Sequence, residues 1–79
     1  MDKVAIIGLG YVGLPTACLA ATVSFDTLGY DTNIELIKEL IQGSIRIKDQ
    51  TVQNLFLEAQ KSNNLLLSAD SECLKNSKI

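Results

Sequence analysis

A glycine-rich segment directly after a short apolar run constrains the fold of this chain more than any other feature. Val4–Ile7 is apolar without alternation, which predicts a strand buried on both faces of a parallel sheet. Glycines at positions 8, 10 and 13 follow this run, and residues 11–21 have the small and apolar side chains of a packed helix. A strand, a glycine turn and a helix in this order are typical of the first unit of a doubly wound α/β sheet.

The remainder of the chain continues the alternation of strands and helices. The sequence predicts strands over residues 24–30 and 65–67, helices over residues 34–42 and from about residue 51, and a further helical turn over residues 71–76. Asn33 suits the N-cap of the first of these helices, either Asp49 or Thr51 that of the second, and Gly43 suits a C-cap. The 79 residues therefore predict an α/β fold, a Rossmann-like doubly wound parallel sheet that is incomplete and corresponds to its first mononucleotide-binding half.

Apolar stripes predict how the two later helices pack. Each helix carries apolar residues at helical spacing, namely Ile34, Ile37, Leu40 and Ile41 on the first and Val52, Leu55, Phe56 and Ala59 on the second. We expect each stripe to face the core.

The three glycines fit the pattern G-x-G-x-x-G of dinucleotide-binding turns. Gly8 permits a tight turn out of the strand, Gly10 lets the backbone approach a pyrophosphate, and Gly13 lets the helix pack closely on the strand. Free N–H groups near Tyr11 and Val12 would face the anion, where the helix dipole adds favourable charge. The alternative is that the glycines serve only the turn and its packing.

An acidic residue follows at a suitable distance. Asp31 lies 18 residues past Gly13, close to the spacing of about 20 residues typical of a ribose-binding carboxylate. Such a carboxylate accepts hydrogen bonds from both ribose hydroxyls and repels a 2′-phosphate. Thr32 and Asn33 offer no positive charge, and the only arginine, Arg46, stands well downstream. NAD is therefore favoured over NADP, with the alternative that Asp31 merely ends a strand.

The composition argues against several classes of function. With no histidine, and with Cys18 and Cys73 outside any cysteine or histidine cluster, we expect no metal site. We expect Cys18 to pack as a small hydrophobe, and Glu72 to disfavour a thiolate at Cys73. A net charge of −2 argues against nucleic acid. Without a long apolar run we expect no membrane span or signal peptide, and a cytoplasmic protein.

The residues around the glycine turn also carry a family resemblance. Gly8-Leu9-Gly10-Tyr11-Val12-Gly13-Leu14-Pro15 resembles the signature of the UDP-glucose/GDP-mannose dehydrogenase family, the NAD-dependent nucleotide-sugar dehydrogenases. Residues 29–33 resemble its second-strand ending, and residues 74–79 resemble the approach to its fourth strand. The resemblance spans the whole chain and implies that residues 1–79 are the N-terminal part of an NAD-binding Rossmann domain. It implies cofactor contacts at Gly8, Leu9, Gly10, Tyr11, Val12, Gly13 and Asp31.

The family oxidises the C6 hydroxymethyl of a nucleotide sugar to a carboxylate with two NAD molecules and a covalent cysteine intermediate. Its nucleophilic cysteine, its lysine and its sugar-binding arginine lie in parts that follow this chain. The resemblance therefore implies no catalytic residue here, a nucleotide sugar bound only through absent domains, and a homo-oligomeric parent enzyme. Many members have a basic residue where Leu36 stands, and an acid-Pro-Gly-Leu run where residues 49–52 stand, of which only Asp49 keeps the acid.

Three interpretations of the function follow. The chain is the NAD-binding portion of a nucleotide-sugar 6-dehydrogenase and is inactive by itself, or it is a free-standing module that binds NAD or another adenine nucleotide. Alternatively it is a non-functional remnant, because the nicotinamide half of the fold is largely missing and an open strand edge invites association.

Overall fold

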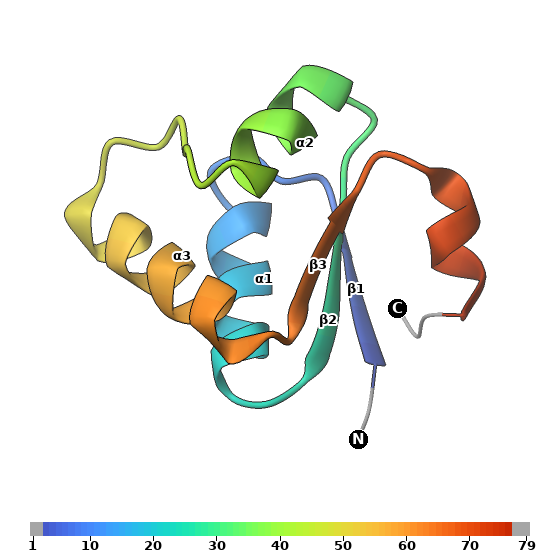
Figure 1. The fold of residues 1–79 in the computed structure, drawn as a ribbon, viewed down its shortest axis with the longest axis horizontal. Coiled ribbons are helices and arrows are strands. Elements are labelled where there is room, and N and C mark those ends of the chain that lie inside the picture. Colours follow the sequence, from blue (N-terminus) through green and yellow to red (C-terminus); the bar gives the residue numbers. More distant parts are fainter. Residues whose placement is uncertain (1–2, 77–79) are drawn as a thin grey trace.

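Three parallel strands form the sheet of the chain in the computed structural model, which describes residues 3–76 apart from the side chains of residues 73, 75 and 76 (Figure 1). The elements are β1 (Lys3–Ile7), α1 (Gly13–Thr22), β2 (Asp26–Tyr30), α2 (Ile34–Ile41), α3 (Gln50–Ser62), β3 (Leu65–Ser68) and the 3₁₀ helix η1 (Ser71–Asn76). The strand order is β1-β2-β3, and both pairings are parallel. This arrangement confirms the predicted α/β class and the incomplete Rossmann-like sheet.

The three α-helices lie on one face of the sheet, and η1 lies on the other side (Figure 1). The core forms between the sheet and these helices, where Ile6, Leu65 and Leu67 pack against a buried cluster that includes Phe56 and Leu40. Leu9, Leu14, Ala17, Cys18, Ala21, Ile37, Ile47 and Ala59 complete that cluster. The core therefore fills only one side of the sheet.

The opposite face of the sheet is partly open. Ala5 and Leu28 pair across β1 and β2 and are both buried, but Ile7 is 56% exposed and Leu66 is 62% exposed. The prediction that β1 is buried on both faces is therefore wrong, and β3, whose apolar run Leu65–Leu67 predicts a short buried strand, is only partly buried. Periodicity reports that a strand is apolar, but the elements packed on each face decide how much of it is covered.

Side chains and a glycine set the ends of α2 and α3 as the sequence predicts. The side chain of Asn33 accepts a hydrogen bond from the N–H of Leu36, and that of Asp49 accepts from Thr51 and Val52. Asp49 rather than Thr51 is thus the N-cap of α3. Gly43, with φ +93°, follows α2 in the left-handed region that favours glycine.

The apolar stripe of α2 is only half buried. Ile37 and Leu40 are buried, whereas Ile34 and Ile41 at the two ends of the helix are 57% and 61% exposed. Their placement in the core was predicted and is wrong, because α2 is short and only its centre meets the core. The stripe of α3 does pack on the core, with Phe56 buried.

The predicted second strand begins later than expected, because residues 24 and 25 complete the end of α1. The N–H of Ser24 donates to the carbonyl of Ala21, and that of Phe25 donates to the carbonyl of Ala20. Ser24 takes a φ of +78° in this C-terminal motif, a position usually held by glycine. The strand β2 therefore starts only at Asp26.

Candidate functional site

The glycine turn connects β1 to α1 at the carboxyl edge of the sheet, where α/β folds bind their ligands. The N–H of Gly8 donates to the carbonyl of Tyr30 at 2.8 Å, which extends the β1–β2 pairing into the turn. Leu9 is buried in the core, and the N–H of Leu14 donates to the carbonyl of Gly10 at 3.1 Å. The turn is thus tied to both its neighbours.

The fold requires two of the three glycines of the turn, each for a different reason. Gly8 has a φ of +92°, in the left-handed region. A Cβ on Gly13 would overlap the carbonyl oxygen of Gly8 and lie 2.8 Å from its carbonyl carbon. Gly10 has neither a positive φ nor any atom within 4 Å of an added Cβ. The fold itself therefore explains Gly8 and Gly13, whereas the space above Gly10 is left open.

The N-terminus of α1 differs from those of α2 and α3. Its N-cap residue, Val12, makes no side-chain hydrogen bond, and its first turn holds no acidic residue, whereas α2 and α3 are capped by their own side chains. The first N–H groups of a helix have no partner within the helix and attract anions. Pro15 in this first turn removes an N–H that needs no intrahelical partner. An anionic group therefore fits the uncapped end of α1.

Asp31 links the end of β2 to the glycine turn. Its Oδ2 accepts from the N–H of Leu9 at 2.9 Å, and its Oδ1 accepts from the N–H of Asn33 at 2.9 Å. These two hydrogen bonds favour the charged carboxylate and hold the pKa of Asp31 below its usual range. Because a carboxylate has further lone pairs, each oxygen can still accept a hydroxyl of a ribose.

A cavity of about 210 Å³ adjoins the turn; we call it the turn cavity. Its wall comes from the turn, from α1 and α2 and from the α2–α3 connection, through Leu9, Gly10, Tyr11, Leu14, Leu36, Leu40, Arg46 and Ile47. Arg46 therefore lies beside the turn in space, although its distance along the sequence suggested otherwise. No local signal in the sequence indicated this, because the path of the α2–α3 connection brings the side chain back.

A salt bridge holds Arg46 in place. Its Nε donates to Oε1 of Glu39, and its Nη2 donates to Oε2 of the same carboxylate, both at 2.9 Å. The pair raises the pKa of Arg46 and lowers that of Glu39. Leu36, where the resembling family often has a basic residue, also lines the turn cavity; it is half-buried and packs on the core.

The cysteines offer no reactive thiol among the described residues. Cys18 is fully buried in α1, and this burial raises the pKa of its thiol to about 11. It packs as a small hydrophobe, as predicted, while the side chain of Cys73 lies outside the described residues. Among the side chains that the structure describes, no cluster suited to a metal ion is found, and no described helix is long and apolar enough to cross a membrane.

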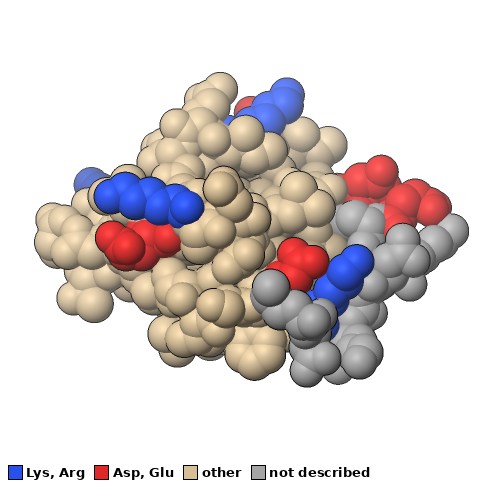
Figure 2. All heavy atoms as spheres, turned by 60° about the horizontal axis from the view of Figure 1, so that its bottom comes forward, with Lys and Arg blue, Asp and Glu red and all other residues tan. Residues whose placement is uncertain are grey.

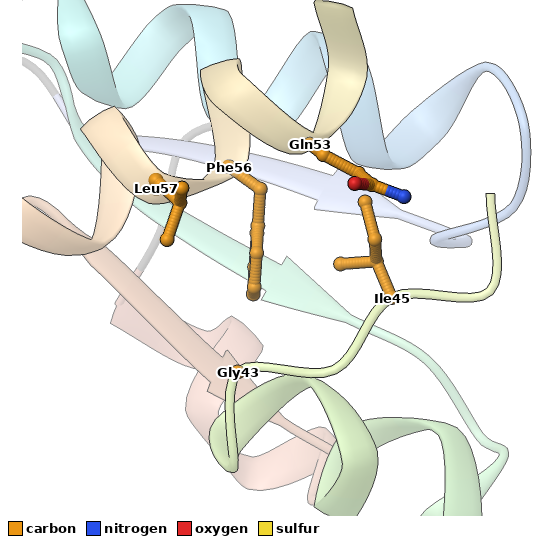
Figure 3. Close-up of a pocket in the computed structure, with 5 residues that line it drawn as sticks. All are labelled: Gly43, Ile45, Gln53, Phe56 and Leu57. Carbon is orange, nitrogen blue, oxygen red and sulfur yellow. The ribbon is translucent and has the colours of Figure 1, made fainter. Parts of the chain in front are cut away.

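A second cavity of about 260 Å³ lies away from the turn, between α3 and the connection that precedes it. Figure 3 shows Gln53, Phe56 and Leu57 on α3 and Gly43 and Ile45 on the connection around it. It has no charged lining residue, so we assign no ligand to it. On the face drawn in Figure 2 the charged side chains are scattered, and no basic patch gathers.

The structure brings together all of the cofactor-binding residues that the sequence predicts. Gly8, Gly10 and Gly13 shape the turn, Tyr11 and Val12 precede the uncapped helix, and Asp31 bonds to the N–H of Leu9. Their contacts with a cofactor stay predictions. Arg46, which the sequence did not place at this site, also lines the turn cavity.

Comparisons with known proteins identify the family of the chain. The model of the UDP-glucose/GDP-mannose dehydrogenase family, NAD binding domain, matches residues 2–79. A UDP-N-acetyl-D-mannosamine dehydrogenase of Pyrococcus horikoshii is 34% identical over 77 residues, which are 98% of this chain and 18% of that relative. One of Methanocaldococcus jannaschii is 36% identical over 70 residues, 89% of this chain and 16% of the relative.

Solved structures give the same result. The UDP-D-ManNAc dehydrogenase from Pyrococcus horikoshii superposes with a TM-score of 0.88 at 35% identity, over 95% of this chain and 18% of that one. A ternary complex of GDP-mannose dehydrogenase from Pseudomonas aeruginosa gives 0.77 at 26% identity, over 89% and 16%. The chain thus spans 16–18% of the length of these relatives. Because the family model matches almost all of it, the chain belongs to the UDP-glucose/GDP-mannose dehydrogenase family, in its NAD-binding domain, and its cofactor is NAD.

Proposed function

We propose that residues 8–13 and Asp31 bind the adenosine and pyrophosphate part of NAD. The observation that carries this proposal is the open space beside Gly10. The fold of the chain does not require a glycine at this position, because an added Cβ would meet no atom within 4 Å. A pyrophosphate against this backbone would accept hydrogen bonds from N–H groups at the uncapped start of α1, including those near Tyr11 and Val12. The free lone pairs of Asp31 would then accept the ribose hydroxyls.

The binding site is complementary to NAD rather than NADP in its charge. Asp31 is ionised at neutral pH, and the N–H groups of Leu9 and Asn33 lower its pKa further, so a 2′-phosphate beside it would meet a negative charge. The dinucleotide without a 2′-phosphate therefore fits better.

We further propose that residues 1–79 are the N-terminal part of the NAD-binding domain of a nucleotide-sugar 6-dehydrogenase. When bound, NAD accepts a hydride, and the whole enzyme would use two NAD molecules to oxidise the C6 alcohol of the sugar to a carboxylate. Because the relatives from Pyrococcus horikoshii and Methanocaldococcus jannaschii are named UDP-N-acetyl-D-mannosamine dehydrogenases, a UDP-sugar is the substrate class that we favour.

By itself the chain should bind cofactor without catalysing a reaction. The three strands correspond to one mononucleotide-binding half, which holds the adenosine side of a dinucleotide. Cys18 is buried with a raised pKa and cannot serve as a nucleophile. The function that we propose for the described residues is to bind the cofactor and to orient its pyrophosphate.

Calorimetric titration of the 79-residue chain with NAD, ADP-ribose and nicotinamide mononucleotide tests this function. We expect ADP-ribose to bind about as tightly as NAD, and the mononucleotide to give no heat. We also expect no NADH from NAD and a UDP-sugar. Absence of any binding by NAD and ADP-ribose at millimolar concentration, with a non-cooperative thermal melt, would instead support a non-functional remnant.

A further inference from the structure

The glycine turn does not by itself balance the charge of a pyrophosphate. The N-terminus of α1 contributes only about half an elementary positive charge, and Asp31 places a carboxylate at the same edge of the sheet. Among the described residues that line the turn cavity, Arg46 is the one cation. Arg46 is therefore the side chain of this cavity that can supply positive charge to the pyrophosphate.

The position of Arg46 suits contact with a ligand at the turn. It lines the turn cavity together with Gly10 and Tyr11 of the glycine turn. The remainder of the cavity wall is apolar apart from Tyr11, so the guanidinium is its only charged group. The side chain is 54% exposed, which leaves it accessible to a solute.

The salt bridge with Glu39 orients Arg46 without using all of its donors. Glu39 accepts from Nε and Nη2, both at 2.9 Å, and so fixes the plane of the guanidinium. The N–H groups of the other terminal nitrogen stay outside this pair. A planar group that is already held in one orientation loses less freedom when it donates to a phosphate oxygen.

We propose that Arg46 is a further cofactor-binding residue, whose guanidinium donates hydrogen bonds to the pyrophosphate of NAD from the α2–α3 connection. The proposal rests on the proposed function, because it concerns the same turn. It adds a side chain from a different part of the chain to a site otherwise built from backbone N–H groups and one carboxylate. Glu39 acts through Arg46 as its positioning residue.

The test replaces Arg46 by glutamine and measures the dissociation constants of NAD, ADP and adenosine by NMR titration of the 79-residue chain. Charge-assisted hydrogen bonds are stronger than neutral ones, so Arg46→Gln should bind NAD and ADP about tenfold more weakly. Adenosine lacks the pyrophosphate and should bind both proteins equally. Arg46→Lys, which keeps the charge without the fork of donors, should give an intermediate loss.

Lys48→Gln is the matched control, because Lys48 is an exposed cation of the same connection that does not line the turn cavity. It removes the same charge and should leave all three dissociation constants unchanged. Raising the salt concentration should also weaken NAD binding more in the unsubstituted chain than in Arg46→Gln.

Three results would overturn the inference. Equal affinity of Arg46→Gln and the unsubstituted chain for ADP excludes the contact. An equal loss on adenosine shows that Arg46 only supports the fold, and an equal loss in Lys48→Gln shows a general effect of charge. Each of these leaves the proposed function intact, whereas an unsubstituted chain that binds neither NAD nor ADP overturns both.

Discussion

Replacing Gly10 and Gly13 by alanine, one at a time, separates the needs of the fold from those of the cofactor. A Cβ on Gly13 meets the backbone carbonyl of Gly8, which cannot rotate away, so α1 and β1 must move apart. Overpacking against side chains typically costs about 1–3 kcal/mol, so we expect a loss of at least ~3 kcal/mol for a collision with backbone. For a domain of this size, with about 4–12 kcal/mol in total, Gly13→Ala should therefore lose about a quarter or more of its stability.

Gly10→Ala should behave in the opposite way. The added Cβ meets no atom within 4 Å, and the φ of Gly10 is not in the left-handed region. Removing the freedom of glycine from the unfolded chain should then stabilise the fold by about 0.4–1 kcal/mol, which raises the melting temperature by about 2–8 °C. The same methyl group occupies the space proposed for the pyrophosphate, so NAD should bind at least ~10-fold more weakly, a loss of about 1.4 kcal/mol or more.

Two measurements decide between these outcomes. Urea unfolding followed by circular dichroism gives the free energy of unfolding of each variant, and calorimetry gives the dissociation constant for NAD. The reasoning is refuted if Gly10→Ala loses as much stability as Gly13→Ala, or if it folds and still binds NAD as tightly as the unsubstituted chain. Gly8→Ala, which forces alanine into a φ of +92°, should lose about 1–2 kcal/mol and serves as the control for a purely conformational effect.

Further predictions concern pH, thiol reactivity and helix ends. The pKa of Asp31 is lower in the folded than in the unfolded chain, so its contribution to stability is present above pH ~4 and is lost as the pH falls below that value. The difference in unfolding free energy between the unsubstituted chain and Asp31→Asn should therefore shrink from pH 6 to pH 3. A constant difference would contradict this prediction. In a Cys73→Ser background, burial and the pKa of about 11 should make Cys18 react with a disulfide reagent only through unfolding, whereas native-state labelling at the rate of a free thiol would argue against the packing described. Ser24→Gly should stabilise the chain by about 0.5–1 kcal/mol and Gly43→Ser should destabilise it by a similar amount, because both positions have a positive φ after a helix. If denaturant unfolding shows that both substitutions change the free energy of unfolding in the same direction, the two positions do not end their helices in the same way.

Much of the fold follows from signals that act within a few residues. The caps Asn33 and Asp49 work through hydrogen bonds to N–H groups two or three positions away, so the sequence alone predicts where α2 begins and reduces the start of α3 to two candidate caps. The need for Gly13 is equally local, because a helix that turns back onto its own strand brings two known backbone positions together. These predictions depend on chain geometry and not on the remainder of the molecule.

The failures share a different cause. Ile7, Ile34 and Ile41 have the apolar character of core residues but are more than half exposed, because no described element covers them. Arg46 lines the turn cavity only because of the path of the α2–α3 connection, along which its salt bridge with Glu39 holds it against α2. The spacing of apolar residues along the sequence does not show which element covers an apolar side chain or which path a long connection takes, because both depend on contacts between distant segments.

The hydrogen bond between Asp31 and the N–H of Leu9 has a consequence for attempts to change the cofactor preference. The carboxylate that would select NAD also braces the turn before any ligand arrives, which reduces the loss of freedom on binding. An engineer who exchanges Asp31 for a neutral or basic residue to admit a 2′-phosphate would therefore loosen the turn as well. In this chain a change of cofactor needs a second substitution that supplies a new acceptor for the N–H of Leu9.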